Sequence, residues 1–338
     1  DAARIRRFLI MIRGATQAPT VASVSQNSDQ AAHTTVLLDE AVEALNINPN
    51  GTYIDCTFGR GGHSKKILER LGEGGRLFAV DRDLAAYQTG QSISDNRFQI
   101  EHLHFSEINQ LATNNGLTRV DGILLDLGIS SPQVDEGERG FSFRLDGPLD
   151  MRMDQTSGET AAELLATISE KKLREVIKDY GEERFAKQVA RAIIKERTDG
   201  NAITTTGQLA KIVASAIPKV EPGKNPATRT FQALRIFVNQ ELEELSLVLP
   251  KCLALLSEGG RLVVISFHSL EDRIVKRFIQ REKNRDDLPS NFPVMAKDLP
   301  QARLLSLGKA IKPSADEVKH NPRARSAVMR VAVRTDVQ

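Results

Sequence analysis

Two apolar stretches, each ending on a carboxylate, flank a glycine-rich segment. The first ends on Asp55, and glycines at positions 59, 61 and 62 follow before a helical pattern begins. The second, residues 76–80, ends on Asp81. In a strand–helix–strand unit, glycines let the backbone approach a ligand, and the acid after the second strand accepts hydrogen bonds from ribose hydroxyls. The spacing therefore predicts a nucleoside-binding site.

Ser64 indicates which nucleoside cofactor fits. A dinucleotide site requires a third glycine at this position, so the pattern G-x-G-x-x-G is not met. The pattern D-x-T-x-G-x-G-G, which starts at Asp55, favours a cofactor without a pyrophosphate, such as S-adenosylmethionine (SAM). A nicotinamide-dependent oxidoreductase is an alternative because it would share this unit, although no further hydride-transfer constellation follows. A strand-to-helix turn that binds nothing is another alternative.

A second chemical segment runs from Asp126 to Gln133 and reads D-L-G-I-S-S-P-Q. Its Ser131-Pro132 turn resembles the loop by which amino-group methyltransferases hold their target. A conjugated exocyclic amine is a poor nucleophile, and acceptors placed on its two N–H bonds make the nitrogen more reactive. We therefore expect Ser131 and Pro132 to position an amine, without a metal. The loop departs from the usual pattern because Gln133 replaces an aromatic residue, and a plain turn is the alternative.

The elements that must position these segments alternate between strand and helix. Apolar stretches at 52–58, 76–81, 98–105 and 120–127 are separated by helix-compatible segments, which predicts a parallel sheet. A long aperiodic loop (134–158) and several short helices (159–217) follow. Strands are expected again at 261–267 and 327–333, after a helical stretch that Pro250 should kink or restart. The predicted architecture is an α/β sheet with an all-helical insert after its fourth strand.

The composition is that of an ordinary globular protein, with 40% hydrophobic and 27% charged residues. Cys56 and Cys252 are expected to be buried thiols of a reducing compartment, and no apolar stretch is long enough to span a membrane. The first 32 residues differ from the rest, and we expect them to be a disordered extension. An over-long gene prediction with Met11 as the true start is favoured, and an organellar transit peptide is the alternative.

Global charge does not indicate a nucleic-acid partner, because the formal net charge is only +2. Such a partner would need local basic clusters. Candidates are Arg229 with Arg235, the stretch from Lys276 to Arg285, and Arg323 with Arg325. Solvated helix faces are the alternative reading of each cluster. A non-catalytic RNA-binding protein would keep such clusters but would not need an intact cofactor loop.

Seven collinear motifs between His33 and Thr335 resemble the RsmH (MraW) family of bacterial 16S ribosomal RNA cytosine-N4 methyltransferases. They are HTTVLL (33–38), the Asp55–His63 loop, DGILLDLG (121–128), ERGFSFR (138–144), DGPLDMRMD (146–154), NPATRTFQALR (225–235) and SFHSLEDR (266–273). The resemblance implies a class I SAM-dependent methyltransferase fold with a mostly parallel seven-stranded sheet. It also implies N4-methylation of a specific cytidine in the decoding region of 16S ribosomal RNA, with the small ribosomal subunit as partner.

The resemblance also implies site residues. Contacts with SAM are expected from Gly61, Gly62, His63, Asp81, Phe105, Asp126 and Gln133, beside the loop residues Asp55 and Gly59. His268 could act as a general base, but an amine loses its proton readily once methylated. A positioning or structural role for His268 is therefore favoured.

A further set of residues is predicted to contact the RNA substrate. Phe141 or Phe143 could stack on the target cytosine in place of the missing loop aromatic, and the alternative is that both anchor the loop. Phosphate contacts are expected from Arg144, Arg152, Arg229 and Arg235.

The expected domains are 33–135 with 226–338 for methyl transfer, and 136–225 as loop and helical insert for substrate recognition. We expect a cytoplasmic protein, or an organellar one if residues 1–32 are a transit peptide. The oligomeric state is open, with a dimer among the alternatives. Whether free RNA or the assembled subunit is the substrate is also open, as is the role of residues 285–322.

Overall fold

The computed structural model describes residues 35–220, 222–284 and 301–336. The expectation of disorder for residues 1–32 lies outside these ranges, as do the first two residues of the HTTVLL motif. No helix among the described residues is long and apolar enough to cross a membrane.

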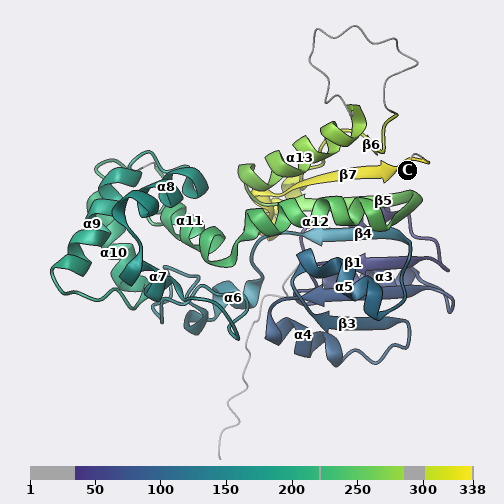
Figure 1. Cartoon of the computed structure of the whole chain (residues 1–338), viewed down its shortest axis with the longest axis horizontal. Helices are drawn as coiled ribbons and strands as arrows, with labels where there is room; N and C mark the ends of the chain where they lie inside the picture. The colour runs from purple at the N-terminus through teal and green to yellow at the C-terminus, as the bar shows by residue number, and fades with distance from the viewer. Residues whose placement is uncertain (1–34, 221, 285–300, 337–338) are drawn as a thin grey trace, which may run out of the picture. The chain divides into compact units, whose positions relative to one another are not determined.

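One seven-stranded sheet organises the larger part of the chain (Figure 1). Its strands are β1 (Thr52–Asp55), β2 (Arg76–Asp81), β3 (Phe98–His102), β4 (Val120–Asp126), β5 (Leu256–Ser266), β6 (Leu304–Ser306) and β7 (Val328–Arg334). Their order is β3-β2-β1-β4-β5-β7-β6. The first five strands pair in parallel, whereas β7 is antiparallel to both β5 and β6. The predicted mostly parallel seven-stranded class I methyltransferase fold is confirmed.

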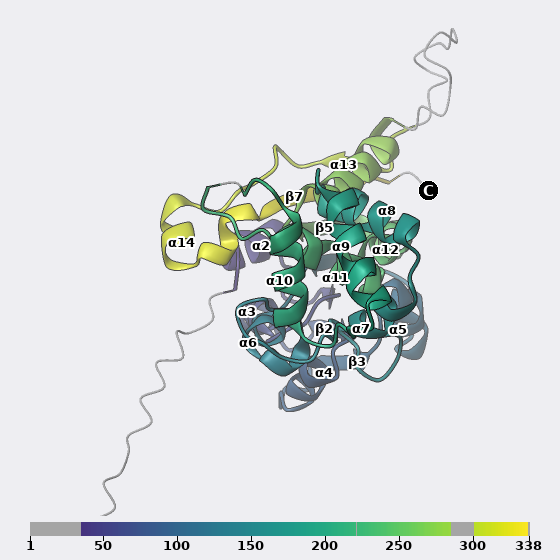
Figure 2. The ribbon, with the colours of Figure 1, turned by 90° about the vertical axis from the view of Figure 1, so that its left-hand side faces the viewer.

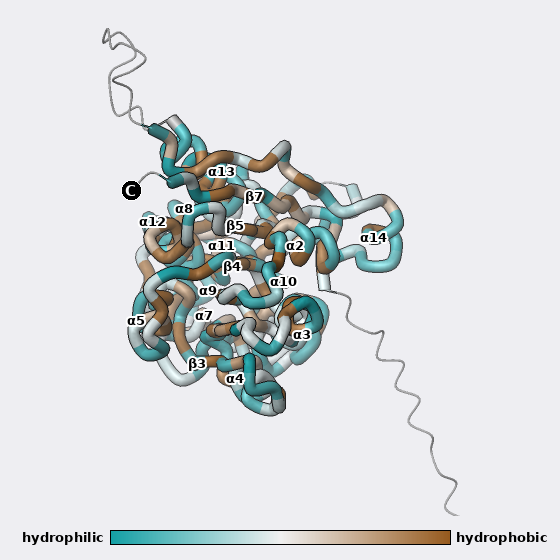
Figure 3. The backbone as a smooth tube through the Cα atoms, turned by 90° about the vertical axis from the view of Figure 1, so that its right-hand side faces the viewer, coloured by the Kyte–Doolittle hydropathy of each residue, from teal (hydrophilic) through white to brown (hydrophobic). Residues whose placement is uncertain are grey.

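Successive strand residues pack into two different hydrophobic cores, because their side chains alternate between the two faces of the sheet. Ile54 of β1 lies in a core with α5 (Ile108–Asn114), α12 (Glu241–Leu255) and α13 (Ser269–Asn284). Its neighbour Tyr53 lies in the opposite core, with α2 (Leu38–Leu45) and α3 (Gly62–Arg70). Cys56 and Cys252 are both buried and free in the first core, as predicted. Figure 3, in which the backbone is coloured by residue hydropathy, shows apolar residues concentrated along these central strands.

The insert between β4 and β5 has a hydrophobic core of its own. It contains α7 (Ala161–Thr167), α8 (Glu170–Gly181), α9 (Ala186–Thr198) and α10 (Thr206–Ala216), which confirms the predicted run of short helices. Helix α11 (Thr228–Asn239) packs on α8 and adds Phe231 and Leu234 to the same core. The hydrophobic core of the insert therefore includes residues of α11, which lie beyond residue 225, the boundary expected from the sequence.

The long helical stretch before β5 breaks at Gln240, and it does not restart at Pro250, which was one of the two outcomes expected there. Gln240 has a left-handed backbone (φ 51°) between α11 and α12, and α12 continues through Pro250. An internal proline costs about 3 kcal/mol, but the surrounding residues Leu245, Leu249 and Cys252 are all buried. Burial of this helix face therefore outweighs the helix-breaking preference of Pro250.

The C-terminal segment includes a strand that was not predicted, β6, and two short helices. These two are α14 (Ala315–His320) and the 3₁₀ helix Pro322–Ser326, which precede β7. Elsewhere in the chain, helix α4 (Leu84–Gln91) follows strand β2, and helix α6 (Ser131–Asp135) follows strand β4. Figure 2 shows α14 beside α2. A hydrogen bond of 2.8 Å from the backbone N–H of Leu37 to Oε1 of Glu317 joins the two. The segment before β7 therefore contacts the start of the described chain.

Candidate functional site

Three predicted carboxylates lie at the same edge of the sheet. Asp55, Asp81 and Asp126 end the parallel strands β1, β2 and β4, so their side chains share the carboxyl edge where α/β sheets bind ligands. Burial raises the pKa of Asp81 to about 6 and that of Asp126 well above its usual range, and the charge of Asp55 adds to both shifts. The structure thus brings together the three acids that the sequence singled out.

Asp55 holds the glycine loop in place. Its Oδ2 accepts a hydrogen bond of 2.7 Å from the hydroxyl of Ser64, and its Oδ1 accepts one of 3.1 Å from the backbone N–H of Thr57. Asp55 is 1% exposed, and burial raises its pKa. Ser64, the residue that breaks the dinucleotide pattern, therefore has a structural role of its own. Asp55 supports the loop, and both of its oxygens are already bonded.

The glycine loop requires glycine at specific positions. Gly59 and Gly61 have left-handed backbones, with φ of 55° and 75°. A methyl group at Gly62 would come within 1.9 Å of Oγ1 of Thr35, because the HTTVLL segment crosses over the start of α3. The loop is also attached to β2, since the N–H of Gly59 donates to Oδ2 of Asp81 at 2.7 Å. These contacts fix the loop between the first two strands.

Asp81 is bonded on both oxygens by backbone only. Besides Gly59, the N–H of Asp83 donates to Oδ1 of Asp81 at 2.8 Å. Each carboxylate oxygen accepts more than one hydrogen bond, so both keep capacity for a hydroxyl donor. Asp81 is partly exposed, whereas Asp55 is not. This arrangement fits the predicted acceptor of ribose hydroxyls.

His63 and Asp126 meet beside the glycine loop. Nδ1 of His63 lies 3.6 Å from Oδ2 of Asp126, and burial lowers the pKa of His63 to about 4. The imidazole is therefore neutral near pH 7, and the contact is not an ion pair. Among the described residues, buried Nε2 of His63 and Oδ1 of Asp126 have no hydrogen-bond partner. Two such polar atoms at a strand edge suit a polar ligand.

Phe105 provides an apolar surface near this edge. It begins the 3₁₀ helix Phe105–Glu107 that follows β3, and it is half-buried against the core formed with α5 and α12. Its position after β3 agrees with the predicted wall for the adenine of SAM. The residues present therefore fit this cofactor: bonded glycines, an acceptor acid, two unpartnered polar atoms and an aromatic wall.

The predicted amine-positioning loop forms the start of helix α6. Ser130 is the N-cap, and its N–H donates to Oε1 of Gln133 at 3.0 Å. The hydroxyl of Ser131 accepts a hydrogen bond from the guanidinium of Arg323, and Pro132 lies in the first turn of the helix. The role of Ser131 and Pro132 in holding an amine stays a prediction.

Gln133 is bound within the protein rather than open to a ligand. Its Nε2 donates to Oδ2 of Asp83 at 2.8 Å, and the same oxygen accepts from Nη1 of Arg139 at 2.8 Å. Gln133, Asp83 and Arg139 are 5%, 6% and 6% exposed. Arg139 also donates to the carbonyl of Met153 at 3.0 Å. The predicted contact of Gln133 with SAM therefore has less support than a role in joining β2, α6 and the long loop.

His268 lies at the end of β5 in a cluster of buried charges. Its Nε2 is 3.1 Å from Oε1 of Glu271, and Arg235 donates to both oxygens of Glu241 at 2.8 and 2.9 Å. Burial alone would raise the pKa of Glu271, but His268 and Arg235 beside it lower that pKa. Ligand atoms of Glu241, His268 and Glu271 lie within 4.8 Å of one another. The sequence showed no such cluster, because Glu241 lies in a separate segment from His268 and Glu271.

Arg235, which was expected to contact phosphate, already has a partner within the protein. Its side chain is 13% exposed and forms a bidentate pair with Glu241. The other predicted cations differ in exposure. Arg152 is paired with Asp150 at 2.8 Å, Arg229 lies 3.9 Å from Glu183, and Arg144 is exposed. Among these four, Arg144 is the most accessible to RNA.

Phe141 and Phe143 anchor the long loop instead of projecting from it. Phe141 is 7% exposed in the core of the insert, with the guanidinium of Arg139 5.9 Å from its ring centroid. Phe143 packs edge-to-face on Phe231, with 5.4 Å between ring centroids. These contacts favour the alternative reading, in which both aromatics anchor the loop, and stacking of Phe141 or Phe143 on the target base stays a prediction.

Sequence reasoning assigned no role to several residues that hold this site together. Asp83 and Asn239 carry no motif signal, and Arg139 lay in a quoted motif without a role. Oδ1 of Asn239 accepts from the N–H of Met153 at 2.8 Å, and its Nδ2 donates to the carbonyl of Met151 at 2.7 Å. These polar contacts tie the long loop to the end of α11.

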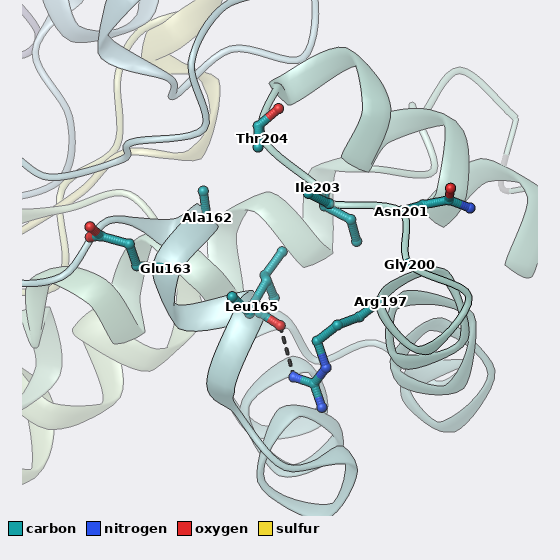
Figure 4. A pocket seen from close by; sticks show the side chains of 10 residues that line it. Ala162, Glu163, Leu165, Arg197, Gly200, Asn201, Ile203 and Thr204 are labelled. Carbon is teal, nitrogen blue, oxygen red and sulfur yellow. Dashed lines mark hydrogen bonds between the residues drawn. The ribbon is translucent and has the colours of Figure 1, made fainter.

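A cavity of about 360 Å³ lies within the insert (Figure 4). Its walls come from α7, the end of α9 and the loop 200–204, and they are mostly apolar. The Nη1 of Arg197 donates to the carbonyl of Leu165 at 2.9 Å, as Figure 4 shows. Glu163 and Asn201 are bonded to Thr160 and Glu196. Because these polar side chains already form bonds within the protein, the cavity offers no group that points to catalysis or to a polar ligand.

Comparison with known proteins gives a consistent result. Residues 30–335 match the model of the MraW methylase family. A ribosomal RNA small subunit methyltransferase H from Methylobacillus flagellatus is 69% identical over 305 residues, which cover 90% of this chain and 95% of that protein. The protein of the same name from Azoarcus sp. is 61% identical, over 92% of this chain and 99% of its own length. Among solved structures, an rRNA methylase from Streptococcus thermophilus has 10% identity and a TM-score of 0.38, with 88% and 93% of the two chains covered.

Proposed function

Because this chain belongs to the MraW methylase family, we propose that it is a SAM-dependent methyltransferase of small-subunit ribosomal RNA. The more specific part of the proposal is N4-methylation of a cytidine in the decoding region of 16S ribosomal RNA. The curated relatives support the coarser statement by name. The resemblance of the motifs supports the finer one, together with a cofactor edge that suits a nucleoside without a pyrophosphate.

The observation that carries the proposal is the unpartnered carboxylate oxygen of Asp126. A buried acceptor without a donor is costly, so its presence beside the glycine loop indicates a ligand that donates a hydrogen bond. The exocyclic amine of adenine in SAM is such a donor, and the adenine would face Phe105. SAM, when bound, supplies an electrophilic methyl group. Asp81 would accept hydrogen bonds from its ribose hydroxyls.

The protein's own contribution is to hold the target amine and exclude water. We propose that the loop from Leu127 to Pro132 presents acceptors to the two N–H bonds of the cytosine amine. Its backbone is fixed by Gly128, which has φ of 95°, and by the capping box between Ser130 and Gln133. The methylated amine loses its proton readily, so no dedicated base is required. His268, held by Glu271, then serves to position neighbouring groups.

The recognition of the substrate is proposed for the long loop and the insert, residues 136–225, together with the part of α11 that packs on them. Arg144 is their most exposed predicted cation. The partner is the small ribosomal subunit, and the relatives are bacterial proteins, so we propose a cytoplasmic location.

The experiment that tests the function is methyl transfer from labelled SAM to small subunits and to naked 16S RNA. Both substrates come from cells that lack this gene, and nucleoside mass spectrometry identifies the product. We expect N4-methylated cytidine that is lost with Asp81→Ala and with Asp126→Ala. Label on another base would contradict the cytidine assignment. Binding of SAM without label on either RNA would leave only the cofactor assignment standing.

A further inference from the structure

The C-terminal segment from Lys309 to Arg325 exposes cations that the site described above does not use. Its five basic residues face only two acids, Asp316 and Glu317. The side chains of Lys309, Lys312, Lys319 and Arg325 are exposed, and none of them forms an ion pair among the residues that the structure describes. Glu317 is bonded to Leu37, and Asp316 lies 3.7 Å from His320. With five cations and two acids, the segment therefore keeps a formal excess of three positive charges.

The segment is held at fixed points. The backbones of Ile311 and Met329 exchange hydrogen bonds of 2.9 and 2.8 Å, and Ala324 is buried in the core beneath α2 and α3. Glu317 joins the segment to the start of α2, as described above. Its exposed cations thus project from an ordered surface rather than from a free tail.

Arg323 places this surface beside the proposed amine-binding loop. Its guanidinium donates to the hydroxyl of Ser131 and lies 2.5 Å from Oδ1 of Asp135. These contacts join residues 192 and 188 positions apart in the sequence. Arg325 follows two residues later and is exposed. Arg323 and its neighbour Arg325 therefore border the carboxyl edge of the sheet, where the target base must enter.

We propose that the segment from Lys309 to Arg325 binds the phosphate backbone of the ribosomal RNA next to the target nucleotide. The inference rests on the proposed function and adds a surface for its substrate. A chain with a net charge of only +2 has little general attraction for RNA, so local cations must supply it. Contacts of this kind position the RNA and carry no sequence information.

The test compares two triple variants that remove the same charge. The first is Lys312→Ala, Lys319→Ala and Arg325→Ala. The control is Lys276→Ala, Arg277→Ala and Lys283→Ala on α13, where all three side chains are exposed. Helix α13 begins beside His268, and its second half runs away from the carboxyl edge (Figure 1). None of these six residues belongs to the proposed catalytic or cofactor machinery, and the α13 residues belong to another basic cluster that the sequence offered for RNA, so the comparison decides between the two clusters.

Binding to small subunits is measured at several salt concentrations, with KM and kcat for methyl transfer. For the first variant we expect affinity to fall roughly tenfold and the slope of log K against log salt to shrink by about 2, as three lost phosphate contacts require. The kcat at saturating RNA, SAM affinity and melting temperature should stay unchanged. Charge-conserving changes, Lys319→Arg with Arg325→Lys, should keep wild-type affinity.

Equal losses in both triple variants would mean general electrostatic attraction and overturn the proposal, as would an unchanged salt slope in the first. Failure of the proposed function is distinguishable, because the wild-type protein would then leave the RNA unlabelled. The salt slope of binding does not depend on turnover.

Discussion

Nδ1 of His63 lies 3.6 Å from Oδ2 of Asp126, and each residue keeps a buried polar atom that no described residue bonds. Burial lowers the pKa of His63 and raises that of Asp126, so the protein disfavours the charged forms that would make an ion pair. Electrostatic attraction between the two side chains therefore contributes little to stability. Their contact is better explained as one side of a site completed by a ligand.

Asp126→Asn should separate stability from function. Removing a buried carboxylate with an unpartnered oxygen relieves a desolvation cost, so the free energy of unfolding near pH 7 should rise by about 1 kcal/mol. Affinity for SAM should fall at least tenfold, since the neutral amide oxygen is a weaker acceptor than a carboxylate and the amide nitrogen only donates. Denaturant unfolding and calorimetric titration with SAM measure the two effects. A variant that loses stability together with affinity would contradict this account, and Asp39→Asn, at an exposed carboxylate, is the control.

The raised pKa of Asp81, about 6, gives a second prediction. The folded-state pKa lies above the ordinary value of 3.8, so folding favours the protonated form. The contribution of this group to stability is therefore full below about pH 4 and is lost as the pH rises through about 6. Asp81→Asn should flatten this part of the stability curve.

Protonation of Asp81, which favours the folded state, should weaken the binding of SAM. SAM affinity should fall as the pH drops below about 6, because a protonated carboxyl accepts hydrogen bonds from ribose less well. Titration calorimetry between pH 5 and pH 8, a range chosen to bracket that value, measures this. An affinity that is flat over the range would show that Asp81 does not titrate where the ribose binds.

Arg139→Ala should destabilise the protein by about 3–5 kcal/mol, because it leaves Asp83 buried without its cation. Arg139→Lys should recover only part of this, since one ammonium cannot reach both Asp83 and the carbonyl of Met153. Urea unfolding followed by circular dichroism measures the change. Arg144→Ala, an exposed neighbour in the same loop, should stay within about 0.5 kcal/mol. Equal costs for the two alanine variants would refute the importance of the buried pair.

The fold could be predicted because its signals are local. Apolar stretches that end on Asp55, Asp81 and Asp126 mark the strands and their polar edge at the same time. The break between α11 and α12 could not be predicted, because the left-handed backbone at Gln240 leaves no mark in residue type. Pro250 does not restart the helix, because the burial of its neighbours outweighs its helix-breaking preference.

Roles that depend on distant partners were the least predictable part of the site. Arg235 and Phe141 have the residue types of RNA contacts, yet Glu241 and the insert core bury them. Nothing in the sequence pattern indicates which face of α11 meets α12. Arg323 was noticed only as part of a basic cluster, because Ser131 and Asp135, the residues that it contacts, lie far away in the sequence.

Arg323 is expected to act on turnover through Ser131. Arg323→Ala should lower kcat several-fold, because the first turn of α6 loses the donor that fixes the Ser131 hydroxyl. Its effect on the unfolding free energy should be below about 1 kcal/mol, since the pair with Asp135 is about half exposed. Asp135→Asn is the matched control: it removes the ion pair but keeps the contact with Ser131, so kcat should change less than about twofold. Arg323→Lys should restore part of kcat because an ammonium can still donate to that hydroxyl. A uniform rise in KM with kcat preserved would instead assign Arg323 to RNA binding, and equal losses in the alanine and asparagine variants would assign the effect to the ion pair.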